Sequence, residues 1–366
     1  MKNITTLLVL ILFTAGMAVA QNNDADVTQN GVDNEATVDQ TGSNDEVIIT
    51  QIGNSNVLNA EATNDRSVNY AEMSQDGTGN FMHLQQTGGG DGQAFLSQVG
   101  ENNIIGAARR SQQGSSGDHY VNASQEGSNN ELKFRQIGGG DGEYLVVSQD
   151  GVANFAEILQ AGQNNEATIE QVGDNNQAYL IQTGDDNNAE IDQEAGQYAD
   201  VTQSGSDNTS KIEQFGRGGA SHTQDQDGDR NTAVVYSPWG ASSGDQIQIG
   251  NDNYSRLAQN GSHTATVTQE GDDNHSALRQ TGGSGTATFY QNGNNNSINA
   301  DQSGTGSEMM VNQLGSNNKA GTPGFANKGL FQVGDGNMLE LNQLSDGNSA
   351  FVDQRGDNNT VAITQN

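Results

Sequence analysis

The chain has 366 residues and carries 46 acidic against 14 basic side chains, which gives a formal net charge of −32. Leu, Ile, Val and Phe together make up about 18% of it, below the roughly 20% at which a highly charged chain is expected to be disordered. This composition argues against a multidomain globular enzyme, whose cores need more apolar surface. It also argues against nucleic-acid binding, which needs a basic face. A disordered acidic chain and a stacked repeat protein remain.

The first twenty residues have the organisation of a secretory signal peptide. Lys2 provides a positive start, an apolar stretch covers residues 4–17, and Ala18-Val19-Ala20 supplies the small residues of a cleavage site. The stretch is short for a membrane span, although a retained anchor is the alternative interpretation. We expect residues 1–20 to be removed and the exported chain to start at Gln21.

The rest of the chain is one long internal repeat. The tripeptide Gln-x-Gly recurs, most often at a step of 11 residues. Over much of the chain, every second turn carries Asn three residues after the glycine, as in Gly31-x-x-Asn34. The repeating unit is therefore about 22 residues long, and the chain holds about 15.5 such units.

Between the turns, inward and outward residue types alternate. Ala167, Ile169 and Gln171 alternate with Thr168 and Glu170, which is typical of a strand with one buried and one solvated face. One strand-turn-strand unit cannot bury its own inner face. Stacked in register, the units predict an all-β solenoid, a cross-β stack of two parallel sheets about 10 Å apart.

The regularly spaced amides are the candidate functional residues. A buried amide without partners costs about 1–3 kcal/mol, whereas in an in-register stack each amide meets its equivalent above and below, and a ladder satisfies both. The glycines beside them are typical of turns. We expect ladder or turn roles for Gln29, Gly31, Asn34, Gln40, Gly42, Gln51, Gly53, Asn56, Gln149, Gly151, Asn154, Gln160, Gly162, Asn165, Gln171, Gly173, Asn176, Gln182, Gln354, Gly356, Asn359 and Gln365.

Three positions of the repeat have lost the glutamine, namely Ala62, Ser237 and Gly324. Pro238 and Pro323 lie beside two of them. Proline cannot donate to an interior ladder, so it belongs where pairing is already interrupted. We expect local bulges or short loops at residues 236–240 and 321–328.

The pattern Asn-x-Ala-x-(Val/Ile)-x-Gln-x-Gly on a 22-residue double period resembles the curlin repeat. Good matches run from Gln29 to Gln40 and from Gln149 to Gln160, and two more follow directly. The resemblance covers essentially all of residues 21–366, with more repeats than familiar curlins carry.

Curlins are the subunits of curli, the extracellular amyloid fibres of bacterial biofilms. The resemblance implies a secreted structural subunit, of the major-subunit type, that forms pilus-like fibres in a biofilm matrix and in adhesion. It also implies an outer-membrane secretion channel and a nucleating subunit as partners. We expect no enzyme activity, cofactor, metal site, nucleic-acid partner or membrane span.

The ends of the repeat favour self-association. The first Gln-x-Gly tripeptide follows the cleavage site closely, and we expect no capping segment after the last strand, residues 360–365. The first and last repeating units should therefore expose unpaired backbone groups and amides, which template the addition of another copy. Outward acids such as Asp39, Glu170 and Asp192 should repel one another in adjacent levels and slow this association.

A monomeric secreted solenoid that acts as an adhesin or binds ice or calcium is the alternative function. Outward threonines at 264, 266 and 268 are of the type found on ice-binding faces, and Asp225-x-Asp227-Gly228-Asp229 resembles a calcium loop without its final Glu. The five histidines, at 83, 119, 222, 263 and 275, lie in different slots. We expect them to be solvated on outward faces.

Overall fold

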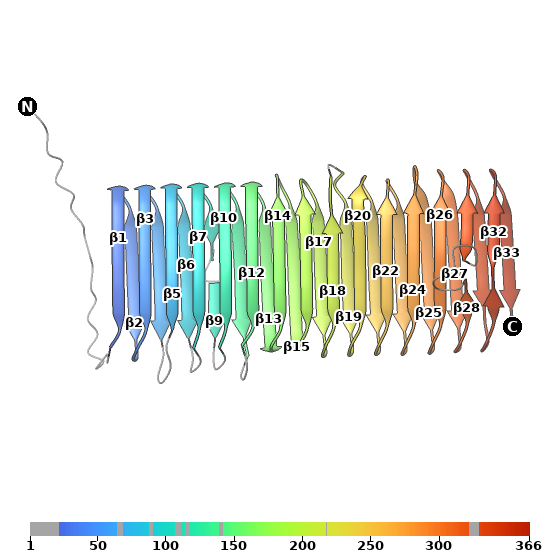
Figure 1. Cartoon of the computed structure of the whole chain (residues 1–366), viewed down its shortest axis with the longest axis horizontal. Coiled ribbons are helices and arrows are strands. Elements are labelled where there is room, and N and C mark those ends of the chain that lie inside the picture. The colour runs from blue at the N-terminus through green and yellow to red at the C-terminus, as the bar shows by residue number, and fades with distance from the viewer. Residues whose placement is uncertain are drawn as a thin grey trace, which may run out of the picture. The chain divides into compact units, whose positions relative to one another are not determined.

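The computed structural model describes residues 22–63, 69–87, 91–106, 111–114, 118–138, 142–216, 218–321 and 329–366. Within these ranges all regular structure is β-strand (Figure 1), and no helix suited to crossing a membrane occurs there. The chain divides into two compact units, residues 1–163 (unit 1) and 164–366 (unit 2). The expected signal peptide lies outside the described residues.

Unit 1 consists of two parallel sheets whose strands alternate along the chain. Its first sheet contains, in spatial order, β1 (Asp24–Val32), β3 (Glu46–Asn54), β5 (Tyr70–Thr78), β7 (Gln93–Glu101), β10 (Tyr120–Ser128) and β12 (Tyr144–Val152). Its second sheet contains β2 (Glu35–Thr41), β4 (Val57–Thr63), β6 (Phe81–Thr87), β8 (Ile104–Ile105) with β9 (Ser111–Gly114), β11 (Glu131–Ile137) and β13 (Phe155–Gln163).

Unit 2 repeats this arrangement. Its first sheet contains β14 (Glu166–Val172), β16 (Asn188–Glu194), β18 (Thr209–Gln214), β20 (Thr232–Trp239), β22 (Tyr254–Asn260), β24 (His275–Thr281), β26 (Ser297–Ser303), β28 (Lys319–Ala320) with β29 (Leu330–Val333), and β31 (Ser349–Ala350) with β32 (Val352–Arg355). Its second sheet contains β15 (Gln177–Asp185), β17 (Tyr198–Ser204), β19 (Ser221–Asp227), β21 (Ser243–Ile249), β23 (Thr264–Glu270), β25 (Gly285–Asn292), β27 (Ser307–Leu314), β30 (Met338–Gln343) and β33 (Thr360–Gln365).

The predicted fold class is confirmed: each unit is a β-solenoid of two parallel, in-register sheets. We call one strand of each sheet with the turn between them a level, and strands that share a level, such as β28 and β29, count once. The described residues then form six levels in unit 1 and nine in unit 2. The resulting fifteen levels are close to the predicted 15.5 units. The difference lies where Gln302 and Gln332 are register partners 30 residues apart, against the usual step of about 22. Gly324 and residues 322–328 of the expected loop lie outside the described residues.

The core of each unit is a thin layer of small and branched side chains between its two sheets. In β3 the inward residues Val47, Ile49 and Gln51 are at most 1% exposed, while their neighbours along the strand are partly or fully exposed. The period-two alternation therefore decides which side chains enter the core. The register keeps identical types in line, so Gln29 pairs with Gln51 and Gly31 with Gly53.

Ala62 and Ser237, where the repeat has lost its glutamine, both lie within strands. Ala62 is buried in β4, between Gln40 and Gln86. Around Ser237, the pairing of β20 with β22 shifts register between Tyr236 and Trp239. A register shift at Pro238 is expected physically, because proline offers no N–H to the ladder.

Candidate functional site

Glutamine side chains form a continuous ladder inside the first sheet of unit 1. The Nε2 atom of each glutamine donates to the Oε1 atom of the glutamine one level on, over 2.6–2.9 Å, from Gln29 through Gln51, Gln75, Gln98 and Gln125 to Gln149. The second amide hydrogen goes to the backbone of the opposite sheet, as from Gln51 to the Glu35 carbonyl at 2.9 Å. Both polar atoms of a buried carboxamide are thereby satisfied.

The second sheet of unit 2 contains a ladder of the same kind. It runs without a break, over 2.8–2.9 Å per step, through Gln182, Gln203, Gln226, Gln248, Gln269, Gln291, Gln313, Gln343 and Gln365. In every step the donor lies on the level nearer the N-terminus. The ladder therefore has a direction, with a carbonyl presented at one end and an amide N–H at the other.

Among the described strands, the ladder is interrupted at two positions. At Ala62 the second sheet of unit 1 lacks a glutamine, and Gln40 Nε2 keeps only the bonds to backbone carbonyls that ladder glutamines such as Gln51 also make, here to Asp24 and Asp45 at 2.9 and 3.0 Å. In the first sheet of unit 2, Ser237 leaves a similar gap between Gln214 and Gln259, where the His222 ring lies.

Asparagines form a second file at the turns. The Asn34 Oδ1 atom accepts from the Asn56 backbone N–H at 3.1 Å, and Asn56 Nδ2 donates to the carbonyls of Ile52 and Gly77, both at 3.1 Å. Each asparagine thus ties its own turn to the turns above and below. The residue before it, such as Ser55 at φ 56°, has the left-handed backbone that short turns need.

The glycine of the repeat is required by close approach of the backbone. Gly53 has φ +107°, and a Cβ atom there would collide with the carbonyl oxygen of Gly77 one level on. Because the same collision would recur at equivalent levels, a larger side chain cannot replace the repeat glycine without opening the turn.

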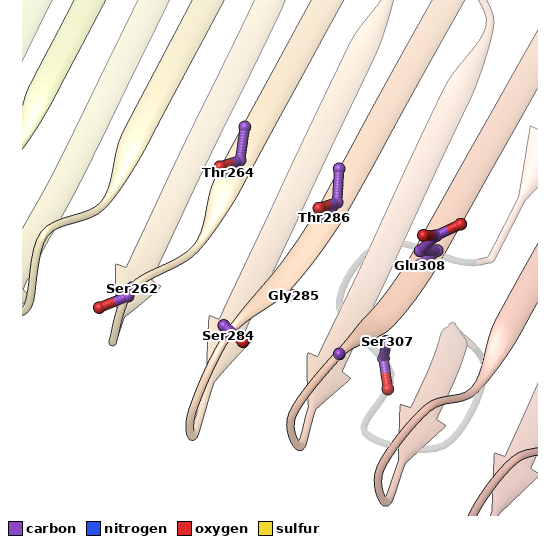
Figure 2. Close-up of a pocket in the computed structure, with 8 residues that line it drawn as sticks. Ser262, Thr264, Ser284, Gly285, Thr286, Ser307 and Glu308 are labelled. Carbon is purple, nitrogen blue, oxygen red and sulfur yellow. The ribbon is translucent and has the colours of Figure 1, made fainter.

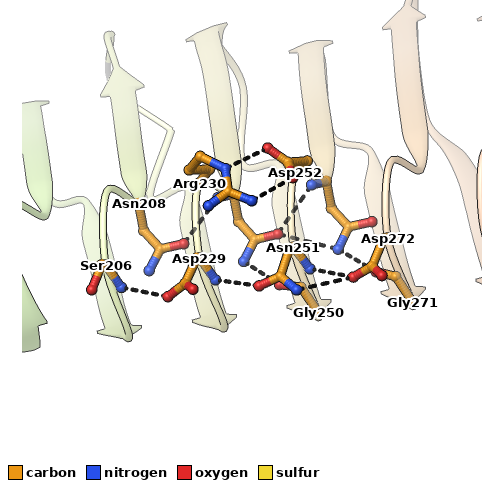
Figure 3. A network of polar contacts seen from close by, with 11 residues as sticks. Ser206, Asn208, Asp229, Arg230, Gly250, Asn251, Asp252, Gly271 and Asp272 are labelled. Atoms are coloured by element: carbon orange, nitrogen blue, oxygen red, sulfur yellow. Dashed lines mark hydrogen bonds and ion pairs between the residues drawn. The ribbon is translucent and has the colours of Figure 1, made fainter.

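A network of partly buried polar turn residues forms a third line of hydrogen bonds in unit 2 (Figure 3). The Ser206 N–H donates to Asp229 Oδ1 at 3.0 Å, the Asp229 N–H to Asn251 Oδ1 at 3.0 Å, and the Asn251 N–H to Asp272 Oδ1 at 2.9 Å. Asp229 of the calcium-like segment is therefore used as a turn acceptor. Within the described ranges, no three His, Asp or Glu side chains are grouped so as to hold a metal ion.

Carboxylates line up on the outer face of the first sheet of unit 2. Glu170, Asp192 and Glu213 are register partners on β14, β16 and β18. Partial burial, followed by repulsion from Glu170 and Glu213, raises the pKa of Asp192 to about 6. Lys211 relieves part of this repulsion through ion pairs with Glu190 and Glu213, at 2.9 and 3.0 Å.

A hydroxyl-lined groove of about 220 Å³ crosses the starts of β23, β25 and β27 (Figure 2). Thr264 and Thr286 are register partners in it, and Glu308 takes the next position. The neighbouring file contains Thr266 and Thr288 and then Met310. Each threonine file is two levels long, which is short for a repetitive ice-binding face.

The expected site residues occupy these files as follows. Gln29, Gln51, Gln149, Gln160, Gln171, Gln182, Gln354 and Gln365 accept from or donate to another ladder glutamine, whereas Gln40 donates to backbone carbonyls. Gly31, Gly42, Gly53, Gly151, Gly162, Gly173 and Gly356 have positive φ. Asn34, Asn56, Asn154, Asn165, Asn176 and Asn359 make turn-to-turn hydrogen bonds.

The expectation of solvated histidines is wrong for four of the five. His83, His119, His222 and His263 are at most 6% exposed, and His275 is half-buried. His222 lies on the inward parity, in register with Ala199 and Gly244. His119 occupies a turn position and accepts the Glu143 N–H at its Nδ1 atom, at 3.2 Å, as an asparagine does elsewhere. Counting parity from the nearest ladder glutamine would have revealed His222.

The chain matches a known protein-family model. The family model of the Curlin associated repeat matches residues 20–53, 140–173, 162–194 and 334–366. These four matches support the curlin-repeat family, whose members are extracellular structural proteins and not enzymes. No curated protein matches the sequence.

The ladder predicts the cost of removing one buried amide. Gln269→Leu deprives Gln248 Nε2 of its acceptor and Gln291 Oε1 of its donor, so it should lower the free energy of unfolding by about 1–3 kcal/mol. Gln177→Leu, at an exposed position of β15, is the matched control and should change it by less than about 0.5 kcal/mol. Urea midpoints of the two variants and the wild type measure this, and equal midpoints for the two variants would contradict it.

The carboxylate file predicts a pH effect of known sign. The folded-state pKa of Asp192 is raised, so protonation of this carboxyl stabilises the folded state. Its contribution to the free energy of unfolding is complete below the ordinary pKa of about 3.9 and is lost as pH rises through about 6. Asp192→Asn should therefore raise the free energy of unfolding by about 1 kcal/mol at pH 7.5, after allowance for solvent screening, and by almost nothing at pH 3.5. Asp301→Asn, which removes a carboxylate 3.3 Å from Arg279, should give no gain at pH 7.5.

Proposed function

We propose that this chain, whose four repeat matches support membership of the curlin-repeat family, is a secreted structural subunit that assembles end to end into curli-like extracellular amyloid fibres. The observation that carries the proposal is that the ladders and inner faces of its outermost described strands are left open. Such faces present the backbone groups and amides that a further level of the same kind would satisfy.

Burial differs sharply between inner and outermost levels. In β1 and β2 the inward residues Val27, Gln29 and Val38 are only partly buried, and in β33 the same holds for Ile363 and Gln365. Equivalent residues one level further in, such as Leu341, are completely buried. The apolar surface left at these strands favours the addition of a matching strand pair.

The direction of the ladder makes the two ends complementary. Among the described residues, none donates to Oε1 of Gln29 or Gln40, while Gln365 Nε2 donates to the Ser349 carbonyl alone, at 3.0 Å. In the proposed fibre, Gln365 of one copy donates to Gln40 of the next. Such an interface joins two different surfaces and does not close on itself, so it generates an open filament.

Outward acids set the conditions for assembly. The column of Glu170, Asp192 and Glu213 is an example of like charges in adjacent levels, and the net charge of −32 adds long-range repulsion between copies. Acid, salt or divalent cations would relieve this repulsion. A biofilm or adhesion role, a secretion channel and a nucleating subunit come from the family resemblance and belong to the proposal.

A monomeric ligand-binding solenoid is the competing function. The hydroxyl-lined groove of Figure 2 is the observation in its favour. It is a shallow surface feature of three levels. Its hydroxyl file comprises Ser221, Ser243, Thr264 and Thr286 on successive strands and ends at Glu308. Seeded elongation separates the two functions, because a monomeric binder would fold without seeds.

Blocking one end strand should stop growth. Ile363→Lys places an ammonium on the inward face of β33, where a further level would bury it unpaired at a cost of several kcal/mol. We expect seeded elongation to slow at least about 10-fold, since each 1.4 kcal/mol is a factor of ten. Thr364→Lys, on the exposed face of the same strand, is the control and should elongate at the wild-type rate.

Elongation is followed by thioflavin fluorescence after dilution from denaturant, with sonicated wild-type product as seed. Wild-type protein should show a lag that seeds abolish. Concentration-independent folding to a soluble monomer, or equal elongation by both lysine variants, would contradict end-to-end assembly through β33.

A further inference from the structure

A histidine from the second sheet completes the first-sheet ladder of unit 2 at the level that lacks a glutamine. Ser237 takes the register position next to Gln214 and is bonded to Ser242, with 2.6 Å between the two Oγ atoms. The His222 ring reaches across the core from β19. Its Nδ1 atom lies 2.9 Å from Gln214 Nε2, and its Nε2 atom lies 2.8 Å from Gln259 Oε1.

The neighbours of His222 determine which of its nitrogens carries the proton. Gln214 Oε1 already accepts from Gln193 at 3.0 Å, so Gln214 presents its amide N–H to the ring and Nδ1 must accept. The Nε2–H group then donates to the Gln259 carbonyl, and Gln259 Nε2 continues the ladder to Gln280 at 3.0 Å. A neutral imidazole in this tautomer has one acceptor and one donor, like the carboxamide it replaces.

The local sequence makes room for the ring. Gly244 is the register partner of His222 on β21. A Cβ atom at Gly244 would lie 2.8 Å from His222 Cδ2 and 2.9 Å from Leu257 Cδ1, closer than real side chains approach. His222, Ser237 and Gly244 therefore act as one substitution set: a missing glutamine, a ring that replaces it and a glycine that accommodates the ring.

The same levels have a polar core. Gln224 donates to Gln246 at 2.7 Å, Gln246 donates to the Ser255 hydroxyl at 2.7 Å, and the Ser210 hydroxyl contacts Gln224. All four side chains are at most 1% exposed. These levels depend on a buried hydrogen-bond network, in which one wrongly placed proton is costly.

On the described strands around His222, no counter-charge lies inside the core to stabilise a charged ring. The charged residues on the strands around His222 occupy outward, partly or fully exposed positions: Asp200 on β17, Lys211 and Glu213 on β18, Asp225 and Asp227 on β19, Asp245 on β21 and Arg256 on β22, with none on β20. Complete burial lowers the pKa of His222 to about 4, against small opposing effects of the Gln259 hydrogen bond and Asp245.

We propose that the Gln214–His222–Gln259 bridge is an acid-sensitive link that loosens the levels from β18 to β22 when the medium is acidified. A doubly protonated ring would turn a donor at Nδ1 towards the Gln214 amide, which is also a donor, and would bury an unpaired cation. The all-glutamine ladder on the opposite sheet has no titratable member and stays intact. The inference concerns the fold of unit 2 and does not depend on fibre formation.

The lowered folded-state pKa of His222 means that acid destabilises the fold. The contribution of the neutral ring to the free energy of unfolding is complete above the unfolded-state pKa of about 6.5 and is lost as pH falls towards about 4. Over this window the unfolding equilibrium constant should rise on the order of 300-fold because of His222. Carboxylates such as Asp192 act in the opposite direction, so the test compares variants at each pH.

The direct test replaces the bridge by a regular ladder rung. The double variant His222→Ala/Ser237→Gln is made in the full chain. Ser237→Gln restores the ladder glutamine of β20 next to Gln214, and alanine is chosen at 222 because the register partner on β17 is Ala199. Relative to this variant, the wild type should lose at least about 100-fold in the folding equilibrium constant between pH 7.5 and 4, read from urea midpoints. His275→Ala removes a half-buried histidine stacked on Tyr254 whose pKa burial also lowers, and it should remove less of the acid sensitivity than the double variant does. Identical profiles for wild type and double variant would overturn the proposal.

A measurement on the wild type keeps the proposal testable if the double variant does not fold. Nitrogen-15 NMR of the imidazoles, with His222 assigned by its loss in His222→Gln, reports both tautomer and titration. The expected result is a neutral ring with its proton on Nε2 down to about pH 5. A ring that titrates near the ordinary value of about 6.5, or that carries its proton on Nδ1, would refute the bridge.

Discussion

A buried carboxamide must have hydrogen-bond partners, and this requirement organises the whole structure. Each glutamine of the repeat satisfies its neighbour one level away, so the glutamines can be buried only if successive strands lie in register. A slip of one residue would place every glutamine on the solvent face and every outward acid in the core. The ladder therefore selects the register, and the register in turn aligns the turn glycines and asparagines.

The constraint also explains which departures are tolerated. At Ala62 both amide hydrogens of the neighbouring Gln40 still have backbone carbonyls as acceptors, so its amide nitrogen is not left unpaired. The gap at Ser237 is filled from the other sheet by His222, with Gly244 making space. A missing rung is thus compatible with the fold when its polar neighbours find a substitute, and the substitute carries its own chemistry.

Most of the fold could be predicted from the sequence, because a short repeat states its period, its inward parity and its turn residues many times over. What escaped prediction depends on single positions without repetition. His222 and Gln224 share the inward parity of the ladder, but that a ring could replace an amide appears only when Gln214, Ser237 and Gly244 are seen in register. The threonine files are likewise short because Glu308 and Met310 interrupt them, which spacing within one strand does not reveal.

The central claim is that the amide ladder runs between successive repeats of one chain. Solid-state NMR of assembled protein, with labelled chains diluted in unlabelled ones, tests this directly through contacts between the Gln269 and Gln291 side chains. The solenoid predicts a strong correlation between Gln269 Nε2 and the Gln291 carboxamide, across the 2.8 Å hydrogen bond, that survives dilution. A correlation of Gln269 only with Gln269 of other copies, lost on dilution, would mean that identical segments stack between chains, and would contradict the account.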